Sequence, residues 1–254
     1  MLSVKNVSKY LLTPLLLTPF TLTTAHADTI LGVYAGIGNW NPEYSGDIGN
    51  SALNIEELGF DDDNYSFGYI ALEHPIPVLP NIRLQRTEVD TSETATLNRA
   101  FEFDDITFNV NETVATDLDL SHTDVILYYE ILDNYVSVDL GINARVFDGE
   151  VTVTGENSGR DTLDIDATLP MLYGKVQFDI PATGFYVGAD ASFIDIDGDS
   201  LSDITLRGGY AFDSVVDLGI EFGYRIIELE LDDLDDFNTD IEIDGFYGAV
   251  TFHF

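Results

Sequence analysis

The sequence contains no cysteine and few basic residues, and both shortages exclude classes of function. Without cysteine, neither a disulfide framework nor a thiolate metal site can form. Ten lysines and arginines oppose 46 aspartates and glutamates, which gives a formal net charge of −36. We therefore expect no nucleic acid partner, because an acidic surface repels phosphates.

Beyond the N-terminal region, the chain also lacks an apolar run near the roughly 18 residues that a membrane-spanning helix needs. It is not a disordered acidic chain either, because 45% of its residues are hydrophobic and 12% are aromatic. The composition therefore indicates a folded protein whose strands, rather than helices, bury its apolar residues.

The first 27 residues have the features of a secretory leader. Lys5 and Lys9 precede an apolar run at 11–17, and Ala25-His26-Ala27 supplies an A-x-A cleavage site. The sequence predicts a cleaved signal peptide over 1–27 and one mature domain over 28–254. Export from the cytoplasm is thus the first prediction about function.

Apolar residues alternate with polar or small ones along the mature chain. At 136–146 the even positions are apolar, whereas the odd positions include Asp139, Asn143 and Arg145. This pattern is typical of a strand between lipid and a polar interior. Four other stretches have the same two faces and about the 9–11 residues of a tilted membrane strand: 185–193, 204–212, 216–226 and 246–254. A first strand is expected at 30–40, and weaker candidates occur at 65–74, 82–89, 123–131 and 172–180.

These stretches predict about ten strands, and their connections alternate in length. Short turns at 75–81, 132–134, 181–184 and 213–215 separate long polar connections at 41–64, 91–116, 148–162, 195–202 and 230–242. We predict an all-β fold, a closed antiparallel transmembrane β-barrel with short periplasmic turns and long acidic extracellular loops. Its first and last strands must pair, since an open edge in lipid leaves backbone groups unpaired.

Two details of this prediction stay open. Arg86 falls on the outward face of 82–89, so that strand is either bulged or has a short membrane portion, and eight strands is the alternative count if it lies in a loop. Aromatic residues near strand ends, among them Tyr65, Phe67 and Tyr69, are expected to face outward as interface girdles.

The mature chain resembles a family of Gram-negative outer-membrane β-barrel proteins named for a Gly-Gly pair. The resemblance is carried by Gly208-Gly209, by the segments 32–36, 73–81 and 120–124, and by Tyr128-Tyr129-Glu130. It implies a barrel in the outer membrane, with no assigned activity. It also implies partners: membrane lipid and lipopolysaccharide, periplasmic chaperones, and the assembly machinery that reads the terminal aromatic signal, here Phe252 and Phe254.

The alternation places a set of charged and polar residues inside the barrel. They are Asp139, Asn143, Arg145, Lys175, Asp190, Arg207, Asp217, Glu221 and Arg225. Charges in such an interior persist only when they are paired and hydrogen-bonded. Two interpretations follow: a structural plug that fills a narrow barrel, or the lining of a narrow pore. The acidic loops would restrict such a pore to cationic or neutral solutes.

Two further sites are hypotheses. Asp195, Asp197, Asp199 and Asp203 have the alternating oxygen ligands of a calcium loop, although the sequence departs from the EF-hand rule. The alternative is an acidic surface that gathers calcium or other divalent ions loosely, or that binds a partner, and no other cofactor is expected.

His122 and Asp124 lie two residues apart, so they could activate water in a surface hydrolase. Any polar inner strand face produces the same spacing. The sequence contains no nucleophile elbow, H-E-x-x-H helix or glycine-rich phosphate loop. We therefore expect a protein without enzymatic activity.

Overall fold

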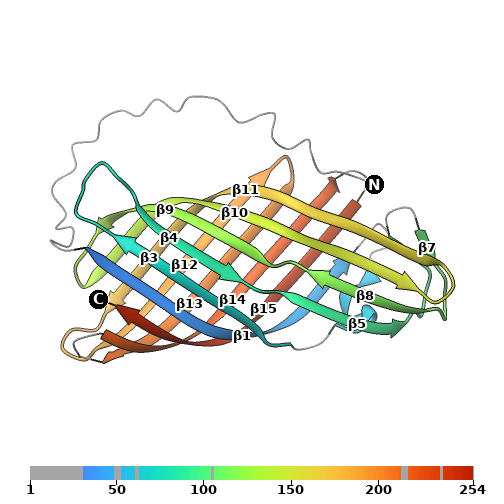
Figure 1. The fold of residues 1–254 in the computed structure, drawn as a ribbon, viewed down its shortest axis with the longest axis horizontal. Helices are drawn as coiled ribbons and strands as arrows, with labels where there is room; N and C mark the ends of the chain where they lie inside the picture. The colour runs from blue at the N-terminus through green and yellow to red at the C-terminus, as the bar shows by residue number, and fades with distance from the viewer. Residues whose placement is uncertain are drawn as a thin grey trace.

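The computed structural model describes residues 31–48, 53–60, 63–103, 106–212, 217–234 and 237–253. The predicted signal peptide over 1–27 and the terminal Phe254 lie outside the described residues. The described chain is almost entirely β-strand, apart from the short 3-10 helix η2 (Ile55–Leu58) (Figure 1). None of its helices has the length and apolar character needed to span a bilayer.

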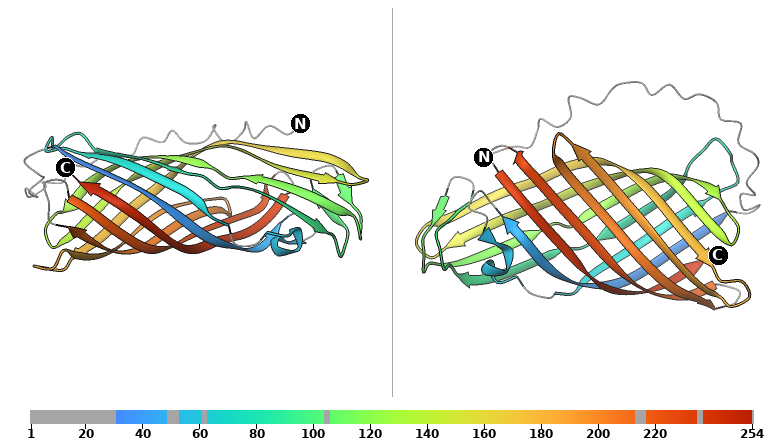
Figure 2. Two further views of the ribbon diagram at one scale, coloured as in Figure 1. Left: turned by 60° about the horizontal axis from the view of Figure 1, so that its bottom comes forward. Right: turned by 180° about the vertical axis from the view of Figure 1, so that it is seen from behind.

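Ten antiparallel strands close into a barrel (Figures 1 and 2). In order around the wall they are β1 (Gly32–Ile48), β3 (Tyr65–Glu73), β4 (Asn81–Thr87), β9 (His122–Leu132), β10 (Val136–Gly155), β11 (Gly159–Asp179), β12 (Phe185–Ile196), β13 (Asp199–Phe212), β14 (Asp217–Leu234) and β15 (Phe237–His253). β15 pairs with β1, so the predicted closure is confirmed. The count of ten is also confirmed, because β4 pairs with both β3 and β9.

The barrel has two unlike ends. Compact turns join β3 to β4, β9 to β10 and β11 to β12 at what we call the short-turn end. At the opposite, long-hairpin end, β10 and β11 stay paired from Val136 as far as Gly155 and Gly159. Much of what the sequence suggested as loop is therefore extended β-hairpin.

Smaller elements complete the long-hairpin end. β5 (Asp90–Thr96) pairs with β8 (Thr113–Asp119), and β8 pairs with the outer part of β10. β6 (Phe101–Phe103) and β7 (Ile106–Phe108) form a separate two-stranded sheet, and β2 (Leu53–Asn54) pairs with β1. These segments fill positions beside and inside the hairpins.

The barrel changes character halfway along its length, as β10 shows most clearly. In its first half Leu140 and Ile142 are exposed outside, whereas Asn143 and Arg145 are buried inside. Beyond Phe147 the two faces exchange their polarity. Asp148 and Glu150 are exposed on the outer face, and Val151 and Val153 are buried on the inner face. The short-turn half therefore has an apolar outside and a polar inside, as lipid requires. The long-hairpin half has the apolar inside of a water-soluble sheet.

One apolar core fills the long-hairpin half. Its buried members include Trp40, Tyr44, Ile48, Leu53, Ile55, Leu58, Phe60, Tyr65, Val89, Phe101, Phe103, Phe108, Val114, Leu118, Leu201, Ile227, Ile241 and Ile243. Residues from η2 and from the β6–β7 sheet thus pack against inward residues of the barrel wall. Burying these side chains stabilises this half by the hydrophobic effect.

Three expected girdle aromatics on β3 face inward instead. Tyr65 belongs to the apolar core and shares a 2.5 Å hydrogen bond with Tyr44. Phe67 packs edge-on against Tyr247, and Tyr69 lies under a guanidinium inside the barrel. The outward prediction was wrong because these residues alternate with Ser66, Gly68 and Ile70, which take the outer face.

Arg86 does lie outside, where the apolar belt of β4 ends. Its Nη1 donates a 3.3 Å hydrogen bond to Thr123 Oγ1 on the neighbouring strand. Of the two explanations for Arg86, the short membrane portion fits this position.

Candidate functional site

A buried ion network lies where the interior of the barrel changes from polar to apolar. Arg145 donates to Asp124 Oδ1 from Nε (2.8 Å) and to Oδ2 from Nη2 (3.0 Å), and it also bonds Asp203. Arg225 donates to Asp203 from Nε (3.0 Å) and Nη2 (2.6 Å). Two arginines thus balance two aspartates drawn from four different strands.

Neutral groups complete the hydrogen bonds of this network. Asn143 Nδ2 donates to Asp124 Oδ1 (2.8 Å) and to Ser192 Oγ (3.2 Å). Thr87 Oγ1 accepts from Arg225 Nη1 (3.1 Å), and the Arg225 guanidinium lies 5.1 Å from the ring centroid of Trp40. Hydrogen bonds therefore tie the network to six strands, β4, β9, β10, β12, β13 and β14, and Trp40 places it against the apolar core.

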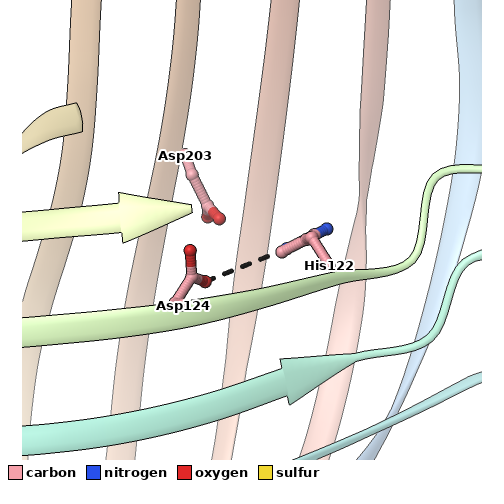
Figure 3. A group of neighbouring side chains, drawn as sticks. All are labelled: His122, Asp124 and Asp203. Atoms are coloured by element: carbon pink, nitrogen blue, oxygen red, sulfur yellow. Dashed lines mark ion pairs between the residues drawn. The ribbon is translucent and has the colours of Figure 1, made fainter. Parts of the chain in front are cut away.

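His122 and Asp124, the suggested water-activating pair, both belong to this network (Figure 3). His122 Nδ1 lies 3.0 Å from the carbonyl oxygen of Leu120, which assigns the proton to Nδ1. Nε2 is then an acceptor, 3.4 Å from Arg225 Nη2 and 3.9 Å from Asp124 Oδ2. Both side chains are almost fully buried, so the pair does not face the surface.

Among the described residues, His122, Asp124 and Asp203 lie close enough together to be considered as metal ligands, since one ligand atom from each lies within 4.8 Å of the others (Figure 3). Both carboxylates are already bonded to guanidinium groups. A divalent ion would therefore have to displace Arg145 and Arg225, and its charge would be added to a buried cluster that is neutral as it stands. The geometry fits an ion-pair network rather than a metal centre.

A second polar layer lies nearer the short-turn end. Arg207 Nη1 lies 2.8 Å from Asp190 Oδ1, and its Nε lies 4.0 Å from Glu221 Oε2. Glu221 accepts 2.8 Å hydrogen bonds from the hydroxyls of Tyr186 and Tyr247. The side chains of this layer come from four neighbouring strands, β12 to β15.

Glycines make room for the rings in this layer. A Cβ on Gly209 would lie 2.3 Å from Cζ of Tyr186, and one on Gly223 would lie 2.3 Å from Cε1 of Tyr247. Gly208, the other member of the Gly-Gly pair, has only ordinary contacts at 3.7 Å or more. Gly209 therefore has a packing role that Gly208 does not share.

The remaining predicted interior residues lie toward the short-turn end. Lys175 Nζ is 2.9 Å from Asp139 Oδ2, and the Asp139 side chain is buried. Asp217 is half-exposed at the rim, where its Oδ2 lies 3.7 Å from His253 Nδ1. Eight of the nine predicted residues thus line the interior, and Asp217 lies at its mouth.

Arg83 belongs to the interior but was absent from the predicted set. It lies on β4 with its guanidinium 4.2 Å from the ring centroid of Tyr69 and its Nη2 2.6 Å from Gln85 Oε1. The sequence held the necessary signal, because Ile82 and Leu84 face outward and place Arg83 between them on the inner face.

The predicted calcium ligands do not come together. Asp195 and Asp197 are exposed at the β12–β13 hairpin, and Asp197 occupies the turn with a positive φ of 57°. Asp203 is buried in the ion network, four residues along β13 from Asp199, which corresponds to about 13 Å in a strand. The four carboxylates therefore do not form one coordination sphere.

A strongly acidic hollow lies on the long-hairpin half. Its volume is about 530 Å³, and its acidic lining consists of Asp90, Asp117, Asp119, Asp148, Glu150, Asp164 and Asp166. Asp148 lies directly opposite Asp166, and Glu150 lies between Asp164 and Asp119. Like charges in such cross-strand pairs repel each other.

Comparison with known proteins finds similar solved structures but no match by sequence. The sequence matches no protein-family model and no curated protein. Among solved structures, the outer membrane protease OmpT from Escherichia coli is similar at 10% identity and a TM-score of 0.47, over 91% of this chain and 98% of OmpT. A Pseudomonas aeruginosa FadL homologue is similar at 8% identity and a TM-score of 0.31, over 88% of this chain and 89% of its own. The fold itself rests on the closed ring of ten antiparallel strands in the described chain.

One prediction needs correction. The sequence was interpreted as that of a protein without enzymatic activity, and the first of these likenesses contradicts this, because a barrel of the same architecture is a protease. The likeness concerns the fold alone and assigns no catalytic residue here. The Gly-Gly family stays a prediction from the sequence.

Proposed function

We propose that this protein is a structural outer-membrane barrel whose lumen does not let ions or solutes pass from one end to the other. The observation behind the proposal is that two layers of buried side chains, one ionic and one apolar, fill the lumen. The ion network occupies the middle of the barrel and consists of Asp124, Arg145, Asp203 and Arg225. The apolar core fills the long-hairpin half. Both layers consist of buried side chains, so an open aqueous path would require their displacement.

Electrostatics also favours the plug over the pore lining. Arg145 and Arg225 are each bonded to carboxylates, and their side chains are at most 6% exposed. Charges that select ions in a pore face water, whereas these charges neutralise each other inside protein. The network then fixes the register of the surrounding strands.

The proposal includes a location and partners. The leader over 1–27 would direct export, and the apolar belt of the short-turn half would lie in the outer membrane. The short turns would face the periplasm, and the long hairpins would extend above lipopolysaccharide. Phe252, with the terminal Phe254, would be read by the assembly machinery after delivery by periplasmic chaperones.

The test is electrical and thermal together. The chain from Asp28 onward is refolded in detergent, checked for heat-modifiable gel mobility and inserted into a planar bilayer. We expect a folded protein without discrete conductance steps. Arg145→Gln should lower the temperature of the mobility change without creating current, whereas Arg86→Gln, on the outer face, should alter neither.

Cation-selective steps in the wild-type protein would contradict the closed lumen. A conductance that changes in size in Arg145→Gln or Arg207→Gln, with thermal stability unchanged, would assign these arginines to a pore instead.

A further inference from the structure

We propose that the short-turn half of the lumen binds a small monoanionic carboxylate between Arg83 on β4 and Arg207 on β13. These strands lie five positions apart in the ring of ten, so the two arginines extend from opposite walls. The site lies on the short-turn side of the ion network, and its existence does not depend on whether the barrel conducts.

Arg83 supplies the main reason for an anion. Among the described residues it forms no ion pair, and its Nε has no hydrogen-bond partner although the atom is buried. Its guanidinium lies against Tyr69 and donates to the neutral Gln85 side chain. A cation enclosed in this way is destabilised unless an anion accompanies it.

Arg207 supplies the second set of donors. Its side chain is 7% exposed, and its Nε and Nη2 have no hydrogen-bond partner within the described chain. Only Nη1 is engaged at short range, with Asp190. Arg83 interacts electrostatically with Arg207, Asp190 and Tyr173, so the unused donors of both arginines serve one region of the lumen.

The surrounding charges select the class of anion. Asp190 and Glu221 both lie against Arg207, and neither forms an ion pair with Arg83. Because two carboxylates match the two arginines in number, a bound dianion would add two negative charges to this group of four side chains. A monoanion introduces one. Guanidinium groups match the planar, two-oxygen shape of a carboxylate, which accepts parallel N–H bonds. A monocarboxylate therefore fits better than sulfate or doubly charged phosphate.

The site can be reached from the short-turn end. The side chains of Lys175 and Asp190 face the lumen, yet they are 21% and 17% exposed. That exposure opens into the barrel interior rather than into lipid. Three charged side chains lie on the approach: Lys175 pairs with Asp139, and Glu73 accepts a hydrogen bond from Tyr128, so the approach has one net negative charge.

The test uses acetate as the probe and the whole mature barrel in a neutral detergent. The midpoint of thermal unfolding is measured against acetate concentration, with sodium chloride or sodium sulfate as the salt at matched ionic strength. A ligand that binds the folded state alone raises the midpoint as its concentration rises. We expect acetate to raise it more than either chloride or sulfate.

Variants assign the effect to the site. Arg83→Gln should weaken acetate binding about 10- to 100-fold, the usual loss for a charge-assisted hydrogen bond. Arg83→Lys should weaken acetate binding less, because lysine keeps the positive charge but lacks the parallel N–H donors of a guanidinium group. The matched control is Arg86→Gln, three residues along the same strand on the outer face. It should keep the wild-type response.

Because the readout is the acetate dependence of each variant, a change in basal stability does not obscure it. Saturation-transfer NMR from tyrosine ring protons to the acetate methyl group gives an independent measurement. The proposal is overturned if acetate acts no more strongly than chloride on the wild-type barrel, or if Arg83→Gln leaves the acetate response intact. Conductance plays no part in either result, so failure here leaves the closed-lumen proposal standing.

Discussion

Arg225 holds Asp203 through two parallel hydrogen bonds, 3.0 Å from Nε and 2.6 Å from Nη2, across the neighbouring strands β13 and β14. The pair lies at the level where the barrel interior changes from polar to apolar. Asp203 also bonds Arg145 on β10, on the other side of the lumen. A single carboxylate thereby ties together parts of the wall that do not pair with each other.

Arg225→Gln should destabilise the barrel by about 3–5 kcal/mol, because Asp203 and Asp124 would then share one arginine in a buried setting. The measurement is urea unfolding in lipid or detergent, followed by tryptophan fluorescence, since Trp40 packs against this guanidinium. Arg86→Gln serves as the control and should change stability little. Equal stability of the two variants would show that the network does not hold the barrel together.

The Gly-Gly pair should separate into one sensitive and one tolerant position. Gly209→Ala places a methyl group into the ring of Tyr186 and should cost about 1–3 kcal/mol through overpacking. Gly208→Ala meets only ordinary contacts and should be neutral or slightly stabilising. Thermal midpoints of the two variants decide this, and an equal loss in both would contradict the packing role of Gly209.

The β10–β11 hairpin should loosen in acid. Glu112, in the connection before β8, accepts hydrogen bonds from the Ser158 hydroxyl and from the backbone N–H groups of Asn109, Asn157 and Ser158. These bonds lower the pKa of Glu112 to about 2 from its usual 4.5. A depressed pKa stabilises the fold above the usual value, and this stabilisation disappears as the pH falls from about 4.5 to about 2.

Amide hydrogen exchange at Asn157 and Ser158 checks the prediction. Protection should fall over that range in the wild-type protein, while Glu112→Gln should start lower and change little with pH. A pH-independent wild-type profile would disprove the role of the carboxylate.

The acidic hollow should oppose folding at low salt. Glu150 lies directly opposite Asp164 on one side and Asp119 on the other. Glu150→Gln should therefore raise stability by about 0.2–1 kcal/mol, and the gain should shrink as salt screens the repulsion. Glu156→Gln, an exposed change near the hairpin turn, is the charge-matched control. Denaturant unfolding at several salt concentrations measures both, and an equal gain from the control would point to net charge alone.

The sequence by itself determined the strands and their two faces. Alternation at 136–146 separated Leu140 from Asp139 and Arg145, and repeated stretches of this kind gave the ten strands and their closure. It also held the signal for Arg83, between two outward residues. Such patterns are local, because side chains of a strand alternate whatever the strand pairs with.

Only the tertiary structure decided what each face meets and which charges pair. Val151 and Val153 alternate with a glutamate and two threonines, much as Leu140 and Ile142 alternate with polar or small residues, yet the first pair faces a protein core and the second faces lipid. The alternation of side chains along a strand determines which side of the barrel wall each one faces. It does not determine whether that side is in contact with lipid, water or a protein core. Likewise, Arg225 finds Thr87 at a separation of 138 residues because the stagger of the closed barrel brings them to one level. That stagger belongs to all ten strands together, and no single segment contains it.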